Sequence, residues 1–120
     1  MIPDNATYIE ILGEPASKAN SRKIVMFGKR PAIIKSQKAR DYVKTFEAQA
    51  KKLSKMWEGD LAVHITIYYK TRRPDLDESV ILDCLQGFVY ANDRQVKEKH
   101  VYHELDRENP RAVIYVWQRK

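Results

Sequence analysis

The segment Leu61–Tyr69 (LAVHITIYY) constrains the fold more than any other part of the sequence. Its apolar residues Leu61, Val63, Ile65 and Ile67 occupy alternate positions, so they share one face of an extended chain. This alternation predicts a β-strand with one buried face. We therefore expect a fold that is organised around a sheet.

Other stretches predict the remaining elements by their residue patterns. Alternation or apolar runs between turn residues predict further strands at Thr7–Leu12, 23–27, 32–35, 97–105 and 112–117. The turn sequence GKRP (residues 28–31) separates two of them and indicates a hairpin with basic side chains at its tip.

Two stretches have apolar residues at helical spacing. The first begins after Ser36, a residue suited to an N-cap, and continues to Trp57. The second begins at Glu78, with Asp77 as its N-cap and Gly87 near its end. The order of elements predicts one compact α+β domain over residues 1–120, with a mixed β-sheet and two main helices.

Composition excludes several classes of protein. No apolar run approaches the roughly 18 residues that span a bilayer, so we expect no membrane partner. The single cysteine, Cys84, excludes an internal disulfide and a cysteine-based zinc site. The first residues, MIPDNATYIE, lack the features of an export signal. These features predict an intracellular protein.

Positive charge is concentrated in one part of the chain. The formal net charge is +6, and residues 15–40 contain eight lysines and arginines but no acidic residue. Such a stretch attracts a polyanion and releases its counterions on binding. The alternative is a solvated basic face that keeps the protein soluble. Charge alone does not distinguish DNA from RNA or from an acidic membrane.

Acidic residues gather directly behind basic ones in the segment KTRRPDLDES (residues 70–79). Asp75 and Asp77 are two positions apart in a stretch that Pro74 keeps extended, so both side chains point to the same side. The helix after them would be about 15 Å long. Residues 89–93, if extended, could return about 16 to 18 Å and bring Asp93 back to its start.

Three carboxylates in one place suit a hard divalent cation such as Mg²⁺. One or two such ions can activate a water molecule for phosphodiester hydrolysis. The alternative is structural: Asp77 is only a cap, Asp93 only a turn residue, and Asp75 only the ion-pair partner of a neighbouring arginine.

Residues 73–96 (RPDLDESVILDCLQGFVYANDRQV) resemble the signature of the RusA-type Holliday junction resolvases. The signature comprises R-x-D-L-D, then D-x-L-x-G on a helix, then D-x-Q-V after a short loop. The upstream stretch EPASKANSRK also resembles the proline-containing basic loop of this family. The matching positions are Asp75, Asp77, Asp83, Leu85, Gly87, Asp93, Gln95 and Val96.

This resemblance implies a fold, an activity and a setting. Members of the family are homodimeric, Mg²⁺-dependent endonucleases of phage and prophage that cut four-way DNA junctions by symmetric nicks. The implied metal ligands and catalytic residues are Asp75, Asp77 and Asp93, with Mn²⁺ able to replace Mg²⁺. The implied location is the cytoplasm of a phage-infected or prophage-bearing host cell.

The sequence departs from the family pattern at two positions. Glu78 replaces the usual asparagine, and Ile81, which falls in the apolar stripe of the helix, replaces a catalytic lysine. Glu78 and Asp83 each have two interpretations. Glu78 either supports the metal ligands or interacts with the dipole at the start of the helix. Asp83 either supports the metal ligands or faces the solvent. The cations that could replace the lysine are Lys97, Lys99, Lys70 and Arg73.

Three functions compete on this basis. The leading hypothesis is a Mg²⁺-dependent nuclease for branched DNA, and the second is a junction-binding protein that lost catalysis with its lysine. The third is a basic RNA-binding domain with incidental acids. The three histidines are interpreted as structural. The expected DNA-binding residues are Lys18, Arg22, Lys23, Lys29, Arg30, Lys70, Arg72, Arg73, Lys97 and Lys99.

Overall fold

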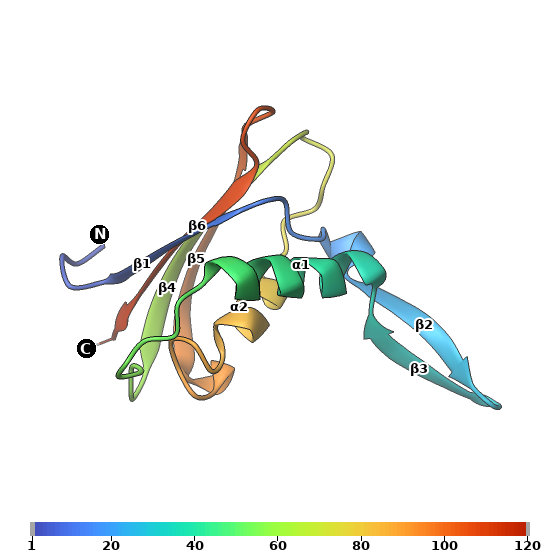
Figure 1. Ribbon diagram of the computed structural model, residues 1–120, viewed down its shortest axis with the longest axis horizontal. Coiled ribbons are helices and arrows are strands. Elements are labelled where there is room, and N and C mark those ends of the chain that lie inside the picture. The colour runs from blue at the N-terminus through green and yellow to red at the C-terminus, as the bar shows by residue number, and fades with distance from the viewer. Residues whose placement is uncertain (1, 120) are drawn as a thin grey trace.

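A four-stranded sheet in the order β1-β6-β4-β5 forms the centre of the fold (Figure 1). The computed structural model describes residues 2–119. β6 pairs antiparallel with both β1 and β4, whereas β4 and β5 run parallel. The predicted mixed sheet is confirmed. The strands predicted at Thr7–Leu12 and Leu61–Tyr69 are confirmed as well. The strands are β1 (Thr7–Leu12), β4 (Leu61–Tyr69), β5 (Val96–Leu105) and β6 (Arg111–Gln118).

Helices α1 (Gln37–Gln49) and α2 (Ser79–Leu85) cover one face of this sheet (Figure 1). A parallel strand pair needs a crossover connection, and α2 lies within the one between β4 and β5. The core fills the layer between the helices and the sheet, where Ile65, Phe46 and Ile81 are 0% exposed. The prediction that Ile81 belongs to the core is therefore confirmed, and the fold is α+β as expected.

Helix α1 is shorter than its apolar spacing predicts. It begins after Ser36, whose side-chain oxygen accepts a hydrogen bond from the Ala39 amide at 3.1 Å, as expected of the N-cap. It ends at Gln49, however, and the chain continues as an irregular segment, where the Leu53 and Trp57 amides donate to carbonyls of residues 88 and 89. The prediction of a helix up to Trp57 is wrong because these apolar side chains reach the same core from an irregular segment.

Helix α2 is a short helix with stabilised ends. The side chain of Asp77 accepts a hydrogen bond from the Ser79 amide at 3.0 Å, although Glu78 occupies the N-cap position itself. Gly87, at φ +88°, turns the chain away soon after the helix ends. The Tyr90 hydroxyl donates to the Leu82 carbonyl at 2.7 Å, which satisfies an acceptor near the end of the helix.

The β2–β3 hairpin (β2, Arg22–Phe27; β3, Arg30–Lys35) forms a separate two-stranded sheet that projects from the body (Figure 1). Its loop has two residues, with a positive φ of 63° at Gly28 and none at Lys29, the pattern that type II′ turns require. The hairpin is confirmed, but the turn is tighter than predicted because Arg30 and Pro31 already belong to the second strand. No helix within residues 2–119 is long and apolar enough to cross a membrane.

Candidate functional site

The passage from β4 into α2 (residues 70–79) is tied to the body through its main chain. The Asp75 carbonyl accepts hydrogen bonds from the Lys18 amide at 3.3 Å and from the Tyr69 hydroxyl at 3.4 Å. The Pro74 carbonyl lies 3.0 Å from Nε2 of His103 on β5, and the rings of His103 and Tyr69 lie 4.4 Å apart. These contacts fix the extended stretch that carries the aspartates.

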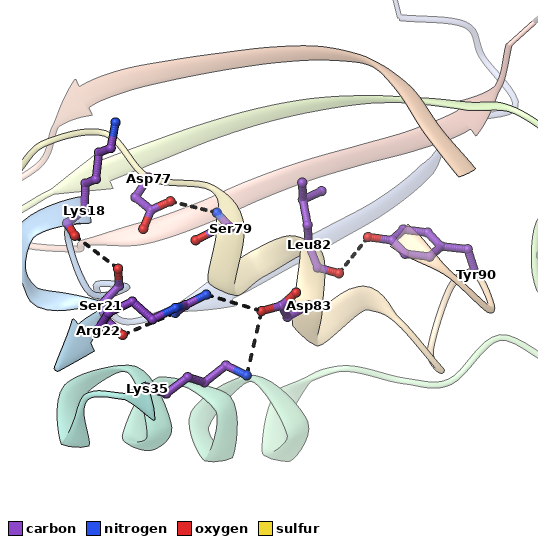
Figure 2. Close-up of polar contacts among 9 residues, drawn as sticks. All are labelled: Lys18, Ser21, Arg22, Lys35, Asp77, Ser79, Leu82, Asp83 and Tyr90. Carbon is purple, nitrogen blue, oxygen red and sulfur yellow. Dashed lines mark hydrogen bonds and ion pairs between the residues drawn. The ribbon is translucent and has the colours of Figure 1, made fainter. Parts of the chain in front are cut away.

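Asp77 is the most enclosed acidic residue of this passage. Its side chain is 9% exposed and accepts one hydrogen bond, from the Ser79 amide. Figure 2 shows it at the start of α2, beside the segment that contains Lys18. Within residues 2–119, no ion pair involves Asp77. A carboxylate with so little solvent and no cation is the kind of group that a metal ion stabilises.

Asp75 is exposed and likewise forms no ion pair within residues 2–119. The structural alternative, in which Asp75 serves only a neighbouring arginine, is therefore not what these contacts show. The alternative for Asp77 is met in part, since its side chain does bind an amide at the helix start.

Glu14, which the sequence reasoning missed, is a further acidic residue near Tyr69. The pKa of Tyr69 is raised to about 12, mainly by burial, and the negative charges of Asp77, Glu14 and Asp75 contribute in the same direction. Glu14 is held by the Lys70 amide, which donates to Oε2 at 2.7 Å, and by Lys38, whose Nζ lies 3.8 Å from Oε1. Its position in the loop EPAS was the available signal.

Asp93 lies toward the other end of α2. It begins the short 3₁₀ helix Asp93–Gln95, and its amide donates to the side chain of Gln86 at 2.8 Å. Asn92 and Gln95 form a reciprocal capping box around this turn. Burial raises the pKa of Tyr90, and the charge of Asp93 acts in the same direction. Asp93 is therefore a turn residue near Gln86 and Tyr90, whereas Asp75 and Asp77 precede α2.

The chain after α2 turns compactly. In residues 86–90 the Gly87 amide donates to the Tyr90 carbonyl and the Val89 amide to the Leu85 carbonyl. Residues 89–93 are therefore not fully extended, since they include the end of this turn, a bend at residue 91 and the start of the 3₁₀ helix at Asp93. Within residues 2–119, no three His, Cys, Asp or Glu side chains are grouped so that they could hold a metal ion. The assignment of Asp75, Asp77 and Asp93 as joint ligands stays a prediction.

The residues present nevertheless fit a magnesium ion. Mg²⁺ in phosphoryl-transfer sites is commonly held by one or two carboxylates, with waters and substrate phosphates as its remaining ligands. Asp75 and Asp77 supply such a pair of oxygen donors, because Asp77 is almost buried and no ion pair within the described residues engages either side chain. Asp75 and Asp77 are thus two carboxylates before α2 whose chemistry suits such an ion.

Glu78 and Asp83, the two further acids of the motif, each bind cations of the protein. Oε2 of Glu78 lies 2.9 Å from Nζ of Lys99 on β5. Asp83 pairs with Arg22 at 3.9 Å and with Lys35 at 3.7 Å, so it joins α2 to the base of the β2–β3 hairpin (Figure 2). Asp83 therefore does not face only solvent, and support of the metal ligands by Glu78 and Asp83 stays a prediction.

The predicted DNA-binding residues fall into groups with different surroundings. Arg22 is engaged by Asp83, and Lys99 by Glu78. The side chains of the remaining eight form no ion pair within the described part of the chain. All of them are exposed: Lys18, Lys23, Lys29, Arg30, Lys70, Arg72, Arg73 and Lys97.

Comparison with known families agrees with this geometry. The model of a family described as "Endodeoxyribonuclease RusA" matches residues 13–117, from the loop that contains Glu14 through β6. The chain belongs to the RusA family. A search of curated proteins found no match.

Family membership relates the charged residues around α2 to a class of reaction. RusA proteins are endodeoxyribonucleases that depend on a metal and act on branched DNA junctions. The two carboxylates before α2 are chemically suited to such a metal, and the exposed lysines and arginines are suited to the phosphates of a DNA strand. The resemblance drawn from residues 73–96 is confirmed.

Proposed function

We propose that the protein is a Mg²⁺-dependent endonuclease that resolves four-way or other branched DNA junctions by paired, symmetric nicks. Family membership supports the reaction class. The observation that carries the proposal is the nearly buried carboxylate of Asp77, beside Asp75 and without a cation among the described residues. We assign this activity to residues 1–120 as one endonuclease domain.

Asp75 and Asp77 are the residues that would hold Mg²⁺, with Mn²⁺ able to replace it. When bound, the ion would activate a water molecule and offset negative charge at the phosphate. The protein itself positions the two ligands: His103 and Tyr69 fix the main chain around them, and the Ser79 amide orients the Asp77 side chain. Asp93 remains part of the predicted ligand set, although it lies toward the other end of α2.

Lys99 is the best candidate for the cation that replaces the lysine of the family pattern. Ile81, at the corresponding position, is 0% exposed and cannot reach a substrate. Lys99 projects from β5 to Glu78, the residue after Asp77, and so places a positive charge beside the start of α2. Lys97, Lys70 and Arg73 have no comparable contact within the described residues. We propose that Lys99 stabilises charge at the reacting phosphate.

A homodimer matches the symmetry of the proposed substrate. A four-way junction offers two equivalent strands, and two active sites related by a two-fold axis would nick both. The setting we propose is recombination or processing of phage or prophage DNA in the host cytoplasm, supported by the sequence resemblance.

Nicking of a synthetic four-way junction tests the proposal. Each strand is labelled in turn, and the protein is added with Mg²⁺, Mn²⁺ or EDTA. We expect paired nicks with either metal and none in EDTA. Asp77→Asn should lower the nicking rate about 1,000-fold or more, because the metal contributes several kcal/mol to such reactions. Asp60→Asn is the matched control, since Asp60 is exposed and lies at the opposite end of β4.

A second function is favoured by one observation. The loss of the lysine to a buried isoleucine would suit a protein that binds junctions without cutting them. Tight, branch-selective binding with no nick under Mg²⁺ or Mn²⁺ would support this function and contradict the first. Lys99→Ala distinguishes them further: reduced nicking with unchanged junction affinity supports a catalytic role for this lysine.

A further inference from the structure

One face of the β2–β3 hairpin is apolar and open to solvent. The strand register sets Ile24 opposite Ile33 and Met26 opposite Pro31, and alternate positions share a face, so these four residues form one surface, here called the apolar ribbon face. Ile24 is 72% exposed, Ile33 71% and Met26 61%. Exposed apolar patches of this kind mark surfaces that bind a partner.

The positive charge of the hairpin favours a nucleic acid over a second copy of the chain as the partner of this face. Residues 22–35 contain five lysines and arginines, and no acidic residue occurs between Pro15 and Arg40. A second copy of the chain that presented the same hairpin would oppose positive charge with positive charge. A nucleic acid instead supplies phosphates for the basic residues and bases for the apolar ones.

The dimensions of the hairpin suit a DNA groove. Each strand has six residues, so the ribbon extends about 20 Å from its base. A two-stranded ribbon has the width of the major groove. Isoleucine, methionine, proline and phenylalanine are the side chains that DNA-bending proteins of the minor groove insert between base steps, so these side chains can separate stacked bases. Unstacking is least costly where the stack is already interrupted. A branch point offers such an interruption, whereas a linear duplex does not.

The base of the hairpin is anchored beside the candidate site. The Ser36 amide donates to the Ser21 carbonyl at 3.1 Å, and Arg22 and Lys35 both pair with Asp83 on α2 (Figure 2). A short 3₁₀ helix, Lys18–Asn20, precedes the hairpin, and its Lys18 amide donates to the Asp75 carbonyl. A ligand held along the ribbon is therefore positioned relative to Asp75.

From these observations we infer that the apolar ribbon face inserts between bases at the branch point of a DNA junction, while Lys29 and Arg30 at the tip hold the flanking phosphates. The inference rests on the proposed function in taking branched DNA as the ligand. It goes beyond that function by assigning Ile24, Met26 and Ile33 as the residues that select branched over linear DNA.

Base unstacking at the branch point provides the test. A four-way junction carries 2-aminopurine at the branch, and fluorescence and affinity are measured in EDTA, with a linear duplex of the same sequence for comparison. The variant Ile24→Thr/Met26→Thr/Ile33→Thr removes three of the four apolar side chains of this face and places β-branched threonine, which favours strands, at all three positions. The matched control is Tyr8→Thr/Leu12→Thr, which alters side chains of β1 that are 53% and 49% exposed.

We expect the wild type and the control to raise the fluorescence on binding and to prefer the junction. The triple variant should give no rise, and its preference for junction over linear duplex should fall about tenfold or more, since unstacking a base step involves a few kcal/mol. Its affinity for the linear duplex should stay within about threefold of the wild type, because the basic residues that contact phosphates are unchanged.

Two results would overturn the inference. In the first, the triple variant keeps both the fluorescence rise and the junction preference. In the second, it keeps the rise but changes its sedimentation from dimer to monomer, which would make the apolar ribbon face a protein contact. Because the readout needs no cleavage, failure of the proposed function is separate: a wild type that unstacks the branch but never nicks it supports the inference alone.

Discussion

The passage from β4 into α2 and the β2–β3 hairpin adjoin each other but are stabilised in opposite ways. The passage is held along its length by Tyr69, His103 and the Lys18 amide, and it contains a buried carboxylate. The contacts that hold the hairpin within residues 2–119 lie at its base, and it exposes its largest apolar side chains. Chemistry that depends on fixed oxygen atoms needs the first environment, and recognition of a large ligand uses the second.

The largest expected difference between the two regions is in stability. Ile81→Ala should lower the free energy of unfolding by about 2 to 5 kcal/mol, because Ile81 is 0% exposed and its removal leaves a cavity. Ile24→Ala should change it by about 0.5 kcal/mol or less, because Ile24 is 72% exposed. Urea denaturation measures both, and similar losses would contradict the division into a packed body and an open ribbon.

The next effect concerns DNA binding by the tip of the hairpin. Lys29→Ala/Arg30→Ala should lower the slope of log affinity against log salt for linear duplex by about 2, since each phosphate contact contributes about 0.9. The control is Lys51→Ala/Lys52→Ala, which removes two exposed lysines after α1. Fluorescence anisotropy at several salt concentrations gives the slope, and equal changes in both variants would deny the tip a particular role.

High pH should loosen the passage rather than the hairpin. Burial raises the pKa of Tyr69 to about 12, against 10.0 in the unfolded chain. The protonated hydroxyl therefore contributes fully to the free energy of unfolding below pH 10.0, and this contribution is lost as the pH rises toward about 12. Tyr69→Phe should make the alkaline decline in unfolding free energy less steep. It should cost about 1 kcal/mol at neutral pH through the lost hydrogen bond to Asp75.

Urea denaturation between neutral pH and pH 11 checks this expectation. Tyr102→Phe is the control, because it removes the hydroxyl of a tyrosine that is 49% exposed. If the free energy of unfolding falls with pH equally steeply in both variants, the burial of Tyr69 is not the cause of the alkaline loss of stability.

The smallest effect should come from the link between the two regions. Asp83→Asn weakens the ion pairs with Arg22 and Lys35, which are partly exposed and contribute less than about 1 kcal/mol. Global stability should change little, but hydrogen exchange at hairpin amides should become up to about fivefold faster. Glu98→Gln, which weakens ion pairs on β5, is the control. Faster exchange in both variants alike would mean that Asp83 is not the anchor.

The sequence was most informative where burial dictates a local pattern. Alternation located β1 and β4 at their observed bounds, and the apolar stripe placed Ile81 in the core. The same apolar spacing misled after Gln49, because a helix and an irregular segment can both bring Leu53 and Trp57 to one core. Periodicity identifies residues that are buried more reliably than the backbone that buries them.

Half of the candidate site was visible in the sequence, and the rest depends on tertiary contacts. Asp75 and Asp77 are close because they are neighbours in an extended stretch. Glu14 reaches the start of the passage from a loop that is 56 residues away from Lys70 in the sequence, as its bond to the Lys70 amide shows. Asp93 could not be placed, because nothing local reveals that the turn at Gly87 is compact.

The pairing of β1 with β6 also bears on how the protein is made. β6 lies between β1 and β4, so β1 has no neighbour in the sheet until Arg111–Gln118 has been synthesised. At typical ribosomal rates this delay is on the order of 5 to 20 seconds. Gly13 separates β1 from Glu14, and its amide donates to the Pro110 carbonyl at 2.9 Å, a contact that also waits for the end of the chain. The edge of the sheet next to the Glu14 loop would thus be the last part of the fold to become fixed during synthesis.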